Sequence, residues 1–86
     1  MTRADLIRRV RERPFVPFRL IVSEGGAYDI RHPDQIMVTR DLAVIGLPGA
    51  QGQDFYETTA LVDLFQVIRA EPLAAVQGTS DGASTG

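Results

Sequence analysis

The chain has 86 residues, of which 44% are hydrophobic and 23% charged, and its formal net charge at pH 7 is −2. This length allows one small domain with a single core layer and little room for a deep substrate pocket. The absence of cysteine excludes disulfides and thiolate metal sites, and no apolar run approaches the roughly 20 residues that a membrane span needs. We therefore expect a cytoplasmic protein with no signal peptide, no membrane segment and no cofactor.

Positive charge is concentrated near the N-terminus, and all nine basic residues are arginines. Residues 1–20 carry six arginines against two acids, a charge of +4, whereas the remainder carries three arginines against nine acids, a charge of −6. A basic element on an acidic body is typical of modules that meet a polyanion or an acidic partner. A solvated helix face gives the same pattern, so the asymmetry alone does not indicate binding.

The first predicted element is a helix that begins at Thr2 and ends before Pro14. The Thr2 side chain can cap the free amide of Asp5, whose own charge suits the positive end of the helix dipole. Pro14 ends the helix because it disfavours helical geometry at the residue before it. One side of the helix carries an apolar stripe of Leu6, Ile7 and Val10. A helix of about eleven residues does not persist alone, so this stripe must pack on a core.

A β-hairpin is predicted next, with strands at 18–22 and 28–32. We expect a three-residue loop, Glu24-Gly25-Gly26, because it makes one face of the hairpin wholly apolar or aromatic. In that register the facing pairs are Val22 with Tyr28, Leu20 with Ile30, and Phe18 with His32. A two-residue turn would instead place Leu20 opposite Asp29, which mixes core with charge.

Residues 36–39 and 42–47 make a second predicted hairpin around Arg40-Asp41. Neither turn residue readily adopts a positive φ, so we expect a three- or four-residue loop rather than a primed turn. A three-residue loop aligns Ile36 with Val44 and Val38 with Leu42. The opposite face then still carries three apolar residues, Met37, Ile45 and Leu47. A hairpin that is apolar on both faces is either sandwiched or displays a contact surface.

The segment 60–71 allows two interpretations. Helical spacing at i, i+3, i+4 and i+7 is present in Leu61, Leu64, Phe65 and Ile68. The same stretch also reads as a strand, one helical turn at 63–66 and a last strand at 67–71. Before it, 48–54 is a glycine-rich loop and 55–59 is extended. After it, residues 77–86 are too polar and glycine-rich to pack, so the predicted domain is 1–76 with a disordered tail at 77–86.

Several motifs resemble those of a group of short uncharacterised bacterial proteins of the planctomycete type. They are Phe15-x-Pro17-Phe18, the Glu24-Gly25 turn, Tyr28-x-Ile30-x-His32-Pro33-Asp34 and the closing segment 62–71. The resemblance covers about residues 5–73 and implies no activity. The order of elements also resembles the Sm-like or SH3-like small barrel, in topology only.

The fold prediction is therefore mainly β, in the α+β class: an N-terminal helix followed by a small five-stranded antiparallel barrel. This topology favours the strand, turn and strand interpretation of 60–71. The alternative is a four-stranded antiparallel sheet with a second, C-terminal helix.

The most chemically suggestive group is His32-Pro33-Asp34, with Arg31 before it. An imidazole, a carboxylate and a guanidinium at a strand end could support acid–base chemistry or hold a phosphate, although Pro-Asp is also a common turn starter. As the only histidine in a chain without cysteine, His32 cannot anchor a typical transition-metal site. Ser23 adjoins a hairpin turn rather than a nucleophile elbow. We therefore predict no catalytic residue and no metal site.

Two functions follow as hypotheses. The preferred one is a non-enzymatic binding module that self-associates or binds a protein partner, through an open strand edge and the face of Met37, Ile45 and Leu47. The alternative is an Sm-like RNA-binding module. Its phosphate contacts would be Arg31, Arg40, Arg8 and Arg9. The acidic net charge argues against a general nucleic-acid footprint, and neither hypothesis involves a membrane.

Overall fold

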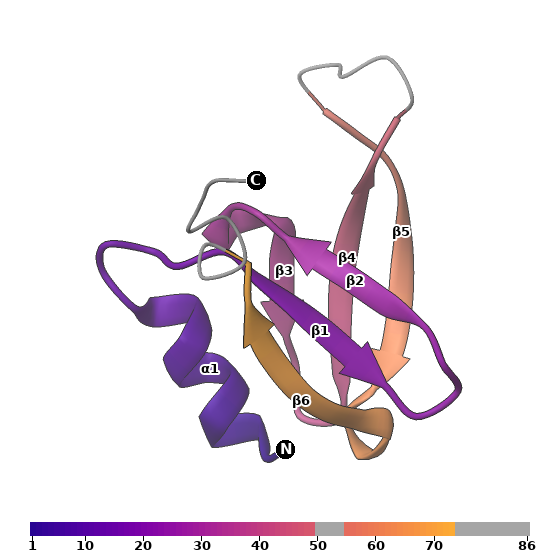
Figure 1. Cartoon of the computed structure of the whole chain (residues 1–86). Helices are drawn as coiled ribbons and strands as arrows, with labels where there is room; N and C mark the ends of the chain where they lie inside the picture. The colour runs from indigo at the N-terminus through magenta and orange to yellow at the C-terminus, as the bar shows by residue number, and fades with distance from the viewer. Residues whose placement is uncertain (50–54, 74–86) are drawn as a thin grey trace, which may run out of the picture.

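The computed structural model describes residues 1–49 and 55–73 (Figure 1). This part of the chain holds one α-helix, six β-strands and two 3-10 turns. In chain order they are α1 (Arg3–Arg11), β1 (Phe18–Val22), β2 (Ala27–Ile30), η1 (Pro33–Gln35), β3 (Ile36–Val38), β4 (Leu42–Pro48), β5 (Tyr56–Asp63), η2 (Leu64–Gln66) and β6 (Val67–Pro72). Within these ranges, no helix has the length and apolar character needed to cross a membrane. The tail predicted at 77–86 and most of the loop predicted at 48–54 lie outside the described residues.

The strands form two separate antiparallel sheets of three strands each, in the orders β2-β1-β6 and β3-β4-β5. The predicted five-stranded barrel is therefore wrong, because neither sheet closes. The chain leaves the first sheet after β2, where Pro33 has no N–H to donate to a ladder and starts η1 instead. The alternative with a C-terminal helix is also wrong. Residues 64–66 make a single 3-10 turn, and β6 then pairs with β1, so the strand, turn and strand interpretation of 60–71 is confirmed.

The predicted N-terminal helix is confirmed. Thr2 and Asp5 form a reciprocal capping box, in which each side chain accepts a hydrogen bond from the other residue's backbone amide. Leu6 points from α1 into the core and is almost completely buried. The amino group of Met1 donates to the carbonyl oxygen of Val67 at 3.2 Å, and α1 also lies against β3 (Figure 1). The helix thus covers the side of the molecule between β6 and β3.

The first hairpin has the predicted loop length but a different register. Its three-residue loop is 23–25, closed by Val22 and Gly26, and Gly25 takes the left-handed conformation with φ 87°. The loop therefore begins one residue earlier than predicted, so Leu20 faces Tyr28 and Phe18 faces Ile30 rather than His32. Because the partners move by two residues, the same side chains still point to the core.

The second hairpin departs from its prediction by one residue. The loop consists of Arg40 and Asp41 alone, because Thr39 closes it: its amide donates to the carbonyl oxygen of Leu42 at 2.8 Å, and its hydroxyl accepts from the Leu42 amide at 3.0 Å. Ile36 therefore faces Ile45, and Met37 faces Val44. A shift of one residue exchanges the two faces of β4 relative to β3, so Ile45 points inward and Met37 outward.

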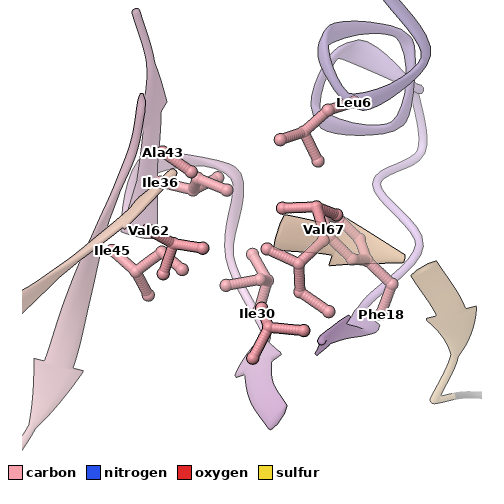
Figure 2. Close-up of a cluster of buried hydrophobic side chains, with 10 residues drawn as sticks. Leu6, Phe18, Ile30, Ile36, Ala43, Ile45, Val62 and Val67 are labelled. Carbon is pink, nitrogen blue, oxygen red and sulfur yellow. The ribbon is translucent and has the colours of Figure 1, made fainter. Parts of the chain in front are cut away.

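One hydrophobic core lies between the inner faces of the two sheets (Figure 2). In the figure, Ile36, Ala43, Ile45 and Val62 from the second sheet face Phe18, Ile30 and Val67 from the first, with Leu6 of α1 above them. The largest fully buried side chains are Phe18, Leu6, Leu20, Ile30 and Ile45. Burial of each side chain of this size contributes roughly 1.5–3 kcal/mol, so the core is the main source of stability.

Gln35, the one buried polar side chain in ranges 1–49 and 55–73, joins the two sheets. Its Oε1 accepts from the Arg31 amide at 2.8 Å, and its Nε2 donates to the carbonyl oxygens of Asp29 at 2.9 Å and Gly46 at 3.0 Å. Asp29 belongs to β2 and Gly46 to β4, so the amide bridges the corner where no backbone ladder forms. With 6% of its surface exposed, Gln35 has exchanged nearly all contact with water for these bonds.

Replacing Gln35 by leucine keeps the volume but leaves three backbone groups without their partner. We expect Gln35→Leu to lower the free energy of unfolding by about 3 kcal/mol or more, since three groups lose their partner and each buried unsatisfied group costs about 1–3 kcal/mol. Urea denaturation followed by circular dichroism measures this change. The matched control is Gln66→Leu, an exposed side chain on η2. Equal stability of the two variants would contradict the bridging role.

Candidate functional site

The apolar surface predicted on the second hairpin is only partly present. Met37 is 61% exposed on the outer face of the second sheet, whereas Ile45 is fully buried and Leu47 is half-buried on the inner face. The three residues do not share a face, because the one-residue shift in register separates Met37 from the other two. Ile45 belongs to the core and cannot contact a partner in this fold.

The structure gives Met37 different neighbours. Met37 faces Val44 across β3 and β4, and Val44 faces Leu61 across β4 and β5. These three side chains form a cross-strand row on the outer face of the second sheet, called here the outer row. Leu61 is 66% exposed. The sequence could have indicated that Leu61 belongs to this surface only if the loop at 40–41 had been assigned two residues. With that loop Met37 faces Val44, which in turn faces Leu61.

The arginines predicted to contact phosphate do not converge. Arg8 and Arg9 lie on α1, and Arg8 donates to Asp5 at 2.8 Å. Arg40 is in the loop of the second hairpin, and Arg31 follows β2. Among these four, only Arg31 lines the large groove described next, so they do not form a basic track for a nucleic-acid backbone.

An open groove of about 1110 Å³ runs along β2, η1, the end of β4 and the start of β5. It contains the motif His32-Pro33-Asp34 with Arg31 before it, together with three aromatic rings. The lining side chains that bear on its chemistry are Tyr28, Arg31, His32, Asp34, Phe55 and Tyr56. Phe55 and Tyr56 line the groove at the start of β5, where the strand pairing shifts between Leu47 and Pro48, a feature that the sequence did not indicate.

The ring of Tyr56 lies directly over Gly46. A Cβ atom at position 46 would come within 2.7 Å of the Tyr56 Cγ, so only glycine leaves room for the ring. At its far end the Tyr56 hydroxyl donates to Oδ1 of Asp34 at 3.4 Å. Partial burial, and then the negative charge of Asp34, raise the pKa of Tyr56 above its ordinary value. The ring is therefore fixed at both ends and keeps its proton at neutral pH.

The groove also borders a cluster of charges on the first sheet. Asp29 accepts two hydrogen bonds from Arg19, at 2.7 and 3.3 Å, and a third from Arg31 at 3.4 Å. The bonds from Arg19, together with the charges of Arg19 and Arg31, hold the pKa of the Asp29 carboxyl below its usual range. One carboxylate is thus shared between two guanidinium groups, and the groove lining as a whole sets Arg19 and Arg31 against Asp29 and Asp34.

The arrangement gives no support to catalysis by His32. Its side chain is exposed, and within the described residues no hydrogen bond of the imidazole to a carboxylate is found. Ser23 precedes β2 and His32 follows it, so a serine–histidine pair does not form. In the same part of the chain, no three acidic or histidine side chains come together to hold a metal ion.

Comparison of the chain with protein-family models, with curated proteins and with solved structures found no match. The resemblance to the planctomycete-type proteins therefore stays a prediction. Any function has to rest on the geometry of the outer row and of the groove.

The contact between Tyr56 and Asp34 can be tested by titration. In a Tyr28→Phe background, the phenolate absorbance reports Tyr56 alone, since the sequence has two tyrosines. We expect Asp34→Asn to move the ionisation of Tyr56 to lower pH, because it removes a negative charge that opposes the phenolate. Asp41→Asn in the same background serves as the control. An unchanged titration in Asp34→Asn would show that the hydroxyl does not meet this carboxylate.

The Asp29 ion pairs should make the stability of the fold depend on pH in the acidic range. The folded-state pKa of Asp29 lies below the ordinary value of 3.8, so the pairs stabilise the fold above that pH. This contribution is lost as the pH falls through the folded-state pKa. We expect the free energy of unfolding, compared between about pH 7 and about pH 2.5, to fall less in Asp29→Asn than in the unmodified protein. The free energy of unfolding of Asp41→Asn should fall as much as that of the unmodified protein. An equal decrease in all three proteins would refute the ion pairs of Asp29.

Proposed function

We propose that the protein is a non-enzymatic binding module that self-associates through the outer face of its second sheet. The observation that carries the proposal is the outer row, in which Met37, 61% exposed, and Leu61, 66% exposed, lie on either side of Val44 on one sheet. Large apolar side chains that adjoin one another on a surface lose an unfavourable contact with water when another surface covers them. The alternative is that the same surface binds a different protein.

The edge of the second sheet supports the same proposal. Among the strands of the described residues, β5 is the longest, with eight residues, and in that part of the chain β4 is its one partner. Its other edge therefore presents unpaired backbone groups beside Leu61, and such an edge can add a strand from another chain. A second copy is favoured as the partner because it would bring an identical outer row, so that both apolar surfaces are covered at once.

A role without catalysis fits the separation of Ser23 from His32 and the exposed position of the imidazole. A cytoplasmic site of action is part of the proposal, since a chain without cysteine depends on no oxidising compartment. The alternative of an RNA-binding module based on Arg8, Arg9, Arg31 and Arg40 is not favoured, because Arg8 and Arg9 lie together on α1, whereas Arg31 follows β2 and Arg40 is in the loop of the second hairpin.

The outer row is tested by placing a charge in it. We expect Leu61→Glu and Met37→Glu to weaken self-association at least tenfold, because the transfer of an apolar side chain of this size is worth roughly 1.5–3 kcal/mol. Sedimentation velocity over a range of protein concentrations measures the association. Both positions are exposed, so the variants should fold, whereas a charge at the buried Ile45 would test folding instead.

The matched control is Ile68→Glu, which changes an exposed apolar side chain on β6, in the other sheet. It should associate like the unmodified protein. If the unmodified protein stays monomeric at every concentration and captures no partner through Leu61, the proposed function is wrong.

A further inference from the structure

The groove along β2, η1 and the start of β5 carries side chains that neither the core nor the outer row uses. Phe55 is 64% exposed, the ring of Tyr56 lies against Gly46, and both residues line the groove. Tyr28, half-buried on β2, lines the same groove. Three aromatic rings around one open depression provide flat apolar surfaces on which a planar ring can stack.

Charge is arranged along the groove rather than spread evenly. On the β2 side, Arg31 shares the single carboxylate of Asp29 with Arg19, so its guanidinium, 59% exposed, retains donors for a further anion. His32 follows it in the chain and lines the same groove. On the η1 side, Asp34 receives the Tyr56 hydroxyl on Oδ1, which leaves Oδ2 available to accept a hydrogen bond.

We propose that this groove binds nucleotides, with the base stacked on Phe55 and Tyr56 and the phosphate at Arg31. An exocyclic amino group of the base can donate to the free oxygen of Asp34. A planar ring that carries an anionic group and an N–H donor matches a lining that combines aromatic, cationic and acidic side chains. Aromatic stacking combined with arginine is the usual way in which proteins hold single-stranded nucleic acid.

The groove is large enough to hold a nucleotide. Its volume of about 1110 Å³ is at the upper end of the roughly 300–1,000 Å³ typical of small-molecule sites, and the groove is open to the surface. A short single strand could therefore lie along it, although a free mononucleotide offers the same recognition chemistry. The proposal does not depend on self-association, since the outer row is formed by other residues.

The test is a titration of the full chain labelled with ¹⁵N, followed by amide chemical shifts. The probes are hexaadenylate, AMP, adenosine and inorganic phosphate. We expect hexaadenylate and AMP to shift the amides of Tyr28, Arg31, Asp34 and Tyr56. Binding of hexaadenylate that is much tighter than that of AMP and weakens with salt identifies a single strand as the source. Equal affinity for the two identifies a free nucleotide, and both results support the site.

Two pairs of variants assign the contacts. Phe55→Ala should weaken AMP binding about tenfold through the loss of stacking, while Phe65→Ala, which removes a 98% exposed ring on η2, should leave it unchanged. Arg31→Gln should weaken binding of AMP but not of adenosine, while Arg40→Gln should affect neither. Arg31→Gln keeps the test decisive if Phe55→Ala does not fold. Leu61→Glu should bind AMP normally, which separates this site from the proposed self-association.

The proposal is overturned if neither AMP nor hexaadenylate shifts these amides at millimolar concentration. It is equally overturned if Phe65→Ala weakens binding as much as Phe55→Ala, or if inorganic phosphate alone binds as tightly as AMP. Free phenylalanine serves as a further probe, and tighter binding of it than of AMP would overturn the proposal in favour of an amino-acid site.

Discussion

The amide of Gln35 holds together two sheets that share no ladder of backbone hydrogen bonds at the β2–β3 corner. Its three bonds fix the carbonyl of Gly46 relative to that of Asp29, and so fix β4 relative to β2. Gly46 in turn supports the ring of Tyr56, and the amide of Arg31 is held by the same side chain. The shape of the groove therefore depends on this one polar group, which apolar packing alone could not replace because packing has no preferred direction.

The core and the strand registers differ in how precisely the sequence must specify them. Apolar periodicity predicted the helix and the strand regions, because burial of Leu6, Phe18 and Leu20 requires only that these side chains share a face. The predicted register of the second hairpin was wrong because the hydroxyl of Thr39 closes a two-residue loop, which is shorter than backbone preferences indicated. That single residue decided that Ile45 lies in the core and that Met37 pairs with Val44. The role of Gln35 could not be predicted, since a glutamine after Pro-Asp has the appearance of an exposed turn residue.

The two surfaces differ in what the sequence could indicate about them. Arg31, His32 and Asp34 were recognised as a chemical group because they are adjacent in the chain. Their aromatic neighbours Phe55 and Tyr56 lie more than twenty positions away, beside a shift in strand pairing for which no sequence signal exists. The outer row likewise consists of residues from three strands. Contacts between strands can be predicted only when the strand register is known, whereas contacts within a turn can be predicted without it.

The closeness of Gly46 and Tyr56 also constrains how this chain can change over evolutionary time. A side chain at position 46 is compatible with the present backbone only if the ring at position 56 is replaced by something small, since the two would otherwise occupy the same space. Loss of that ring would remove one wall of the groove and the partner of Asp34. Descendants that keep the tyrosine must therefore keep the glycine, and positions 46 and 56 are inherited as a pair although nine residues separate them.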